Sequence, residues 1–159
     1  MEIIYTRFRK RARQIVSLYP TPDFYQDHSF ANEMSRQHFE TNFFTAELRK
    51  FVAEHLEEKF GHGLEHAVKV AIDAGALMII ENKLAQQPDN RINRRVAVVQ
   101  CASLLHDIKR SQENHAIKGS DHARKVLKPY PLDPIEVEDI CRAIRNHEAF
   151  KPTIKADTF

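Results

Sequence analysis

The spacing of apolar residues constrains the fold of this chain more than any other feature. Apolar side chains recur at intervals of three and four residues along most of the sequence, which is the period of one face of an α-helix. Glycine occurs only 4 times, and we find no competing β-strand pattern. With 159 residues, of which 42% are hydrophobic, the chain can bury one core. We therefore expect an all-α fold in a single compact helical domain.

Turn and capping residues divide this pattern into helices. Asp133, Pro134 and Glu136 have the spacing of a capping box with proline at the first helical position. A strongly apolar helix ends at His106 and Asp107, and we expect it to lie at the centre of the domain. Residues 21–41 mix aromatic and polar residues, which indicates a loop with a short helix. The predicted helices cover residues 3–18, 43–59, 64–85, about 90–107, 113–127 and 134–147.

The bulk composition argues against a secreted or membrane-spanning protein. No apolar stretch is long enough to cross a bilayer, and the N-terminal residues lack the apolar core of a signal peptide. Cys101 and Cys141 stand in apolar helical patterns, which is typical of buried thiols in a reducing compartment. We expect a cytoplasmic protein with no membrane partner.

The charge distribution says little about partners. The formal net charge is only +2 at pH 7. Basic residues gather near the N-terminus, and nucleic acid is one ligand for such a cluster, although a solvated helix face is the favoured interpretation. The cluster consists of Arg7, Arg9, Lys10, Arg11 and Arg13.

The histidines point to a metal site. The chain has 9 histidines, and His66 near the start of one predicted helix and His106 with Asp107 near the end of another form a natural set. Imidazole and carboxylate bind divalent metals, and a helical bundle can direct such side chains to one point. Interior histidines satisfied by hydrogen bonds are the alternative. A carboxylate at the end of an apolar run nevertheless needs a partner, and a cation is one.

Two segments carry a resemblance to a known family. Residues 63–71, Gly-Leu-Glu-His-Ala-Val-Lys-Val-Ala, and residues 102–109, Ala-Ser-Leu-Leu-His-Asp-Ile-Lys, resemble the HD superfamily of metal-dependent phosphohydrolases. The hallmark of that family is a first His, a later His-Asp doublet after an apolar helix, and a final Asp. The likeness continues through His115, Gly119 and the segment ending at His147. It implies an HD-type core over residues 61–159, with residues 1–60 as a helical extension packed on that core.

The resemblance also implies a function. The expected activity is cleavage of a small nucleotide-like phosphomonoester or phosphodiester by a metal-activated water, with one or two divalent ions (Mn, Fe, Co, Ni, Zn or Mg). His66, His106 and Asp107 would be metal ligands, and Asp107 and Lys109 the catalytic residues. The side chains implied as ligands of a second ion or as substrate contacts are His115, His147, Arg110 and Arg145, although the two arginines also fit a solvated surface.

The final aspartate departs from the family pattern. Asp157 is the only aspartate after His147, and it follows that histidine more closely than is usual in the family. Three alternatives remain: Asp157 is the ligand, the ligand lies beyond Phe159, or the site lacks it. Glu148 stands where members with two metals often carry a second histidine, so one ion is as well supported as two.

Two other functions fit parts of the sequence. His62, Glu65 and His66 spell the H-x-x-E-H pattern of a zinc protease helix. Gly61 and Gly63 favour a helix that begins after His62, however, so we expect His62 to be dispensable for metal binding. The second alternative is a non-catalytic helical module that binds metal or nucleotide for regulation.

Overall fold

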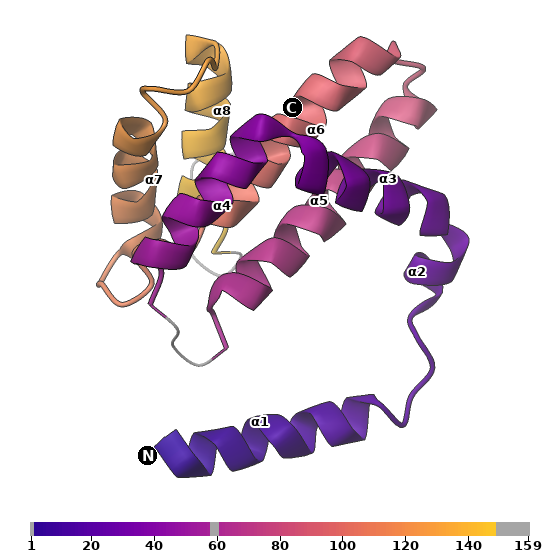
Figure 1. Ribbon diagram of the computed structural model, residues 1–159, viewed down its shortest axis with the longest axis vertical. Coiled ribbons are helices and arrows are strands. Elements are labelled where there is room, and N and C mark those ends of the chain that lie inside the picture. The colour runs from indigo at the N-terminus through magenta and orange to yellow at the C-terminus, as the bar shows by residue number, and fades with distance from the viewer. Residues whose placement is uncertain (1, 58–60, 149–159) are drawn as a thin grey trace.

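The computed structural model describes residues 2–57 and 61–148, and this part of the chain contains eight α-helices and no β-strand (Figure 1). The all-α prediction is confirmed. The helices are α1 (Glu2–Val16), α2 (Asp23–Asp27), α3 (Ser29–Thr41), α4 (Phe43–His55), α5 (Leu64–Leu84), α6 (Asp89–Leu105), α7 (His115–Val126) and α8 (Pro134–Arg145).

Helices α5 and α6 form a hairpin at the centre of the domain. Helix α3 packs on α5, α4 packs on α6, and α7 and α8 pair with each other, with α8 in contact with α6 (Figure 1). The apolar helix of the sequence is thus α6, and it contacts α3, α4, α5 and α8 as expected for a central element.

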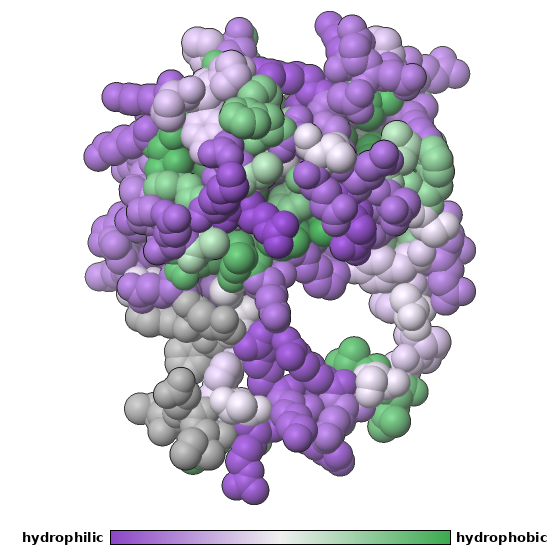
Figure 2. Space-filling model, in the orientation of Figure 1, coloured by the Kyte–Doolittle hydropathy of each residue, from purple (hydrophilic) through white to green (hydrophobic). Residues whose placement is uncertain are grey.

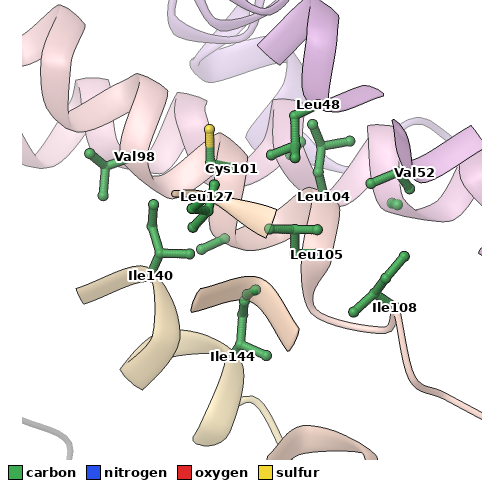
Figure 3. Packing of buried hydrophobic residues seen from close by; sticks show 14 of the residues in the cluster. Leu48, Val52, Val98, Cys101, Leu104, Leu105, Ile108, Leu127, Ile140 and Ile144 are labelled. Carbon is green, nitrogen blue, oxygen red and sulfur yellow. The ribbon is translucent and has the colours of Figure 1, made fainter. Parts of the chain in front are cut away.

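The hydrophobic core lies between α6, α4 and α8. Leu104 and Leu105 of α6 point toward Leu48 of α4 and toward Ile140 and Ile144 of α8, and all five side chains are almost fully buried (Figure 3). The two cysteines are free and buried in the same cluster. Burial raises the pKa of Cys101 to about 12, against a smaller opposing effect of Arg94. Both thiols are therefore packing residues, as predicted.

The start of α8 follows the capping signal closely. Asp133 Oδ1 accepts a hydrogen bond from the Ile135 backbone N–H at 2.8 Å, and Glu136 Oε2 accepts one from the Asp133 N–H at 2.7 Å. These two bonds satisfy N–H groups that a helix start leaves without partners. Helix α8 ends at Arg145, two residues before His147.

The prediction of a loop with a short helix over residues 21–41 was wrong in its extent of helix, because α2 and α3 cover most of this segment. Ser35 of α3 is buried, and its hydroxyl donates to the Ile72 carbonyl of α5 at 2.7 Å. Gly75 allows this close approach, since a Cβ there would overlap Ser35 Oγ. Apolar spacing does not signal a helix contact made through a serine and a glycine. Helix α4 also ends at His55, earlier than the predicted residue 59.

Helix α1 stands apart from the bundle, and Figure 2 shows open space between it and the rest of the domain. Arg9 and Arg13 reach Glu65 of α5 at 3.5 and 3.3 Å. Ile4 and Phe8 are exposed on α1. Within the described ranges, α3 and α4 pack on the core, and Phe24 of α2 packs against the smaller buried cluster that includes Ile79 and Val96. None of the helices in these ranges is long and apolar enough to span a lipid bilayer.

Candidate metal centre

Four helix ends converge on one cluster of histidines around Asp107. His66 lies in the first turn of α5, and His106 and Asp107 follow the last residue of α6. His115 is the first residue of α7, and His147 lies two residues after α8. Gly119 lets α7 pass close to α8 and to the end of α6. A Cβ at this position would lie 3.3 Å from Ile144 Cγ2 and 3.6 Å from the His106 carbonyl oxygen.

Asp107 lies at the centre of the cluster and is only 3% exposed. On one side, its Oδ2 lies 2.7 Å from His62 Nδ1 and 3.1 Å from His106 Nε2. On the other side, its Oδ1 lies 3.6 Å from the Nε2 atoms of both His115 and His147. Oδ1 is buried and forms no hydrogen bond with any residue in the described ranges. Arg110 NH1 lies 3.5 Å from this oxygen, which is an ion pair but not a hydrogen bond. A buried carboxylate oxygen that accepts no hydrogen bond is costly, so this position favours a cation.

Backbone carbonyls set the tautomers of two histidines. The Nδ1 atoms of His106 and His147 lie 2.7 and 2.6 Å from the carbonyl oxygens of Ser103 and Ile144. A carbonyl can only accept, so each Nδ1 carries a proton, and Nε2 is the nitrogen that faces the cluster. It donates there when protonated and presents its lone pair to a cation when the ring is neutral. This is the orientation that metal-binding histidines adopt.

The Nε2 atoms of His115 and His147 face each other at 3.2 Å, which is a hydrogen-bond distance. Since Nε2 of neutral His147 is an acceptor, a proton on His115 Nε2 can join the pair, and a cation can take the place of that proton.

The pKa shifts of Asp107 and His66 favour the protonation states that bind metal. For His147, burial lowers the pKa, but the contact with Asp107 outweighs burial and raises it. Burial by itself raises the pKa of Asp107, but its contacts with His106, His147 and His62 outweigh burial and hold this pKa well below its usual range. Burial lowers the pKa of His66, and the nearby rings of His106 and His62 lower it further. An ionised carboxylate beside a neutral imidazole is a metal-ligand pair at neutral pH.

Two groups of potential ligand atoms share the Asp107 carboxylate. His62, His66 and Asp107 form the first, and Asp107, His115 and His147 form the second; within each group the ligand atoms lie within 4.8 Å of one another. His106 lies beside the first group, with its ring centroid 5.3 Å from that of His66. One carboxylate oxygen faces each group, an arrangement able to serve one ion or two.

The HD domain family model matches residues 63–156, which is more than half of the sequence. The chain belongs to the HD-domain family. The match confirms the resemblance seen in the sequence and places the chain among proteins that are mostly metal-dependent hydrolases. No curated protein and no solved structure matches it.

The HD-domain cluster brings together most of the predicted site residues. His66, His106, Asp107, His115 and His147 all meet there, and Arg110 joins them, with its NH1 atom 3.0 Å from His115 Nε2.

Three predicted residues lie elsewhere or outside the described ranges. Lys109 lines a cavity of about 70 Å³ beside Asp107 but belongs to neither ligand group. Arg145 is exposed, and no contact with the cluster is present within the described part of the chain. Its charge instead helps to lower the pKa of Glu138, after the stronger effect of the Arg124 hydrogen bond. Asp157 lies outside the described residues.

His62 is the residue that sequence reasoning missed. Helix α5 does begin after it, at Leu64, as predicted. The preceding turn nevertheless brings His62 back onto Asp107, and its ring centroid lies 4.9 Å from that of His66. The four-residue interval between the two histidines was the available signal.

The same geometry argues against the protease alternative. His62 precedes the helix, so the two histidines do not share one helical face. Glu65, the general base of that motif, is exposed and paired with α1.

Proposed function

We propose that this HD-domain chain is a metal-dependent phosphohydrolase that cleaves a small nucleotide-like phosphomonoester or phosphodiester. The observation that carries the proposal is the buried Oδ1 of Asp107, which accepts no hydrogen bond within the described ranges and lies among histidines that direct Nε2 toward it. The family supplies the class of reaction.

The donor set fits a divalent ion. Imidazole nitrogens from His62, His66, His106, His115 and His147 surround one carboxylate, which is a ligand set for Mn, Fe, Co, Ni or Zn. When bound, such an ion neutralises charge on phosphoryl oxygens and lowers the pKa of a coordinated water.

Arg110 is placed to bind the substrate phosphate. Its NH1 atom lies 3.5 Å from Asp107 Oδ1, yet 37% of the side chain is exposed. The guanidinium therefore reaches from the cluster toward solvent, where it can donate charge-assisted hydrogen bonds to phosphate oxygens. Lys109 adds a second positive charge at the small cavity that it lines with Asp107 and Arg110. At about 70 Å³ this cavity is much smaller than the pockets that hold whole small molecules, so the rest of the substrate extends outside it.

His62 has a different place in the proposed reaction. Its side chain is 32% exposed, whereas that of Asp107 is 3% exposed. If Nδ1 donates to Asp107 Oδ2, Nε2 is free to accept a proton or a metal bond. Asp107 thereby orients His62, as carboxylates orient histidines in many metal sites.

The test combines metal content with activity. Gently purified protein is analysed by plasma mass spectrometry and screened against phosphomonoesters and phosphodiesters, nucleotides included, with manganese, cobalt, nickel and magnesium. We expect near-stoichiometric metal and hydrolysis of at least one ester, both lost in Asp107→Ala and His106→Ala. Metal without hydrolysis of any ester would favour the regulatory binding module. Absence of metal, with no response to any added ion, would overturn the proposal.

A further inference from the structure

A groove of about 400 Å³ lies away from the metal centre, between α6, α8 and the end of α5. It is lined by Arg91, Arg94 and Arg95 from the start of α6, whereas the cluster lies beyond the other end of that helix. Arg95 precedes His106 by eleven residues, which is roughly 16 Å along a helix. In Figure 1 the turn between α5 and α6 lies at the opposite end of the hairpin from the start of α5. The groove is therefore a separate site.

One of the three arginines has a structural partner. Arg94 donates from Nε and NH2 to the carboxylate of Glu136 on α8, and NH2 also donates to the Pro131 carbonyl at 2.9 Å. This bidentate pair joins α6 to α8 and neutralises the Arg94 charge. Arg94 therefore lines the groove, but its charge is not available to a ligand.

The other two arginines have no carboxylate partner within the described ranges. Arg95 NH1 donates to Asn82 Oδ1 at 2.6 Å. Asn82 is fully buried and is itself fixed by donating to the Met78 carbonyl at 2.6 Å. Arg91 makes only a long contact, 3.4 Å, with Gln87 Oε1. A buried amide therefore holds one guanidinium in place, and a second, exposed guanidinium stands one helical turn away.

The remaining lining residues of the groove are apolar or acidic rather than basic. Met78 and Val98 line it and are 9% and 7% exposed, so they present a small apolar surface. Asp139 of α8 adds one carboxylate able to accept a hydrogen bond from a ligand hydroxyl or amine. A volume of about 400 Å³ is within the usual range for a small-molecule pocket.

We infer that this groove binds a small phosphate monoester with an apolar group. Its phosphate would lie on Arg91 and Arg95, and its apolar part on Met78 and Val98. Two guanidiniums without carboxylate partners match the charge of a phosphate monoester, which is about −1.5 to −2 at pH 7. The inference does not depend on the proposed activity, because the groove shares no residue with the metal centre.

The test uses phenyl phosphate as the probe, titrated into ¹⁵N-labelled protein in the presence of a chelator, so that metal-dependent binding and hydrolysis are absent. We expect amide shifts at residues 78–98 and 136–139, with a Kd near or below about 1 mM. Inorganic phosphate, which lacks the apolar group, should bind more weakly. Arg91→Gln and Arg95→Gln should each weaken binding about tenfold, as expected for loss of hydrogen bonds to a charged group.

Two control variants separate the alternatives. Arg7→Gln removes an exposed arginine of α1 and should leave the affinity unchanged. Arg110→Gln removes the arginine of the metal centre and should leave the shifts at the groove unchanged. Because Arg91 is exposed, Arg91→Gln is informative even if Arg95→Gln disturbs Asn82. Shifts confined to the metal centre, unchanged affinity in Arg91→Gln, or no binding at concentrations well above 1 mM would overturn the inference.

Discussion

Replacing Asp107 by asparagine should abolish the stabilisation of the fold by divalent metal. The substitution keeps the size of a side chain that is 3% exposed but removes the charge that both ligand groups share. An ion that binds only the folded state, at 100 times its Kd, adds about 2.7 kcal/mol to the free energy of unfolding. At roughly 2–4 °C per kcal/mol for a chain of this size, Tm should rise by about 5–11 °C.

The variant should respond far less at the same ion concentration. If loss of the charge raises the Kd by at least 100-fold, the remaining stabilisation is about 0.4 kcal/mol, or about 1–2 °C. The assay is a thermal melt followed by circular dichroism at pH 7.5, with manganese or nickel, each protein being compared with itself in chelator. Asp121→Asn, an exposed aspartate of α7, is the matched control and should keep the full shift. A variant at residue 107 that keeps the full shift would refute the assignment of this carboxylate as the shared ligand.

Three further predictions follow from other contacts. His62→Ala should weaken metal binding about 10- to 100-fold, because the His62 ring contacts the Asp107 carboxylate. The affinity is measured by competition with a chromophoric chelator, and an unchanged affinity would show that the contact is incidental. Gly75→Ala should cost about 1–3 kcal/mol in urea unfolding because the new Cβ overlaps Ser35 Oγ, whereas Gly119→Ala should cost less. Glu136→Gln should cost about 1 kcal/mol at pH 7. Burial raises the pKa of Glu136, but its arginine partner on α6 and the capping N–H outweigh burial and lower it. This stabilisation is therefore fully present above the unfolded-state pKa of 4.5 and is lost as the pH falls through the lowered pKa of the folded state, so the difference between wild type and variant should shrink as the pH is lowered below 4.5.

The helices and the His-Asp doublet were accessible from sequence because both depend on short-range patterns. The period of three and four residues predicted α5 and α6, and the capping residues at 133–136 predicted the start of α8. Such signals act over a few residues, and local backbone geometry is sufficient to satisfy them. Helix α3 was missed because Ser35 and Gly75 join it to α5 by close approach and hydrogen bonding, contacts that apolar spacing does not signal.

The surroundings of Asp107 were decided by tertiary structure. The residue types for a metal site were evident in the sequence, as was the order in which they occur. Only the packing of α5, α6, α7 and α8 determines that His62 and His106 approach one oxygen of the carboxylate while His115 and His147 approach the other. Tertiary packing likewise brings Arg110 to the cluster and leaves Arg145 exposed. Contacts of this kind depend on the relative position of helix ends that are distant in sequence, and the spacing of residues within each helix does not determine that position.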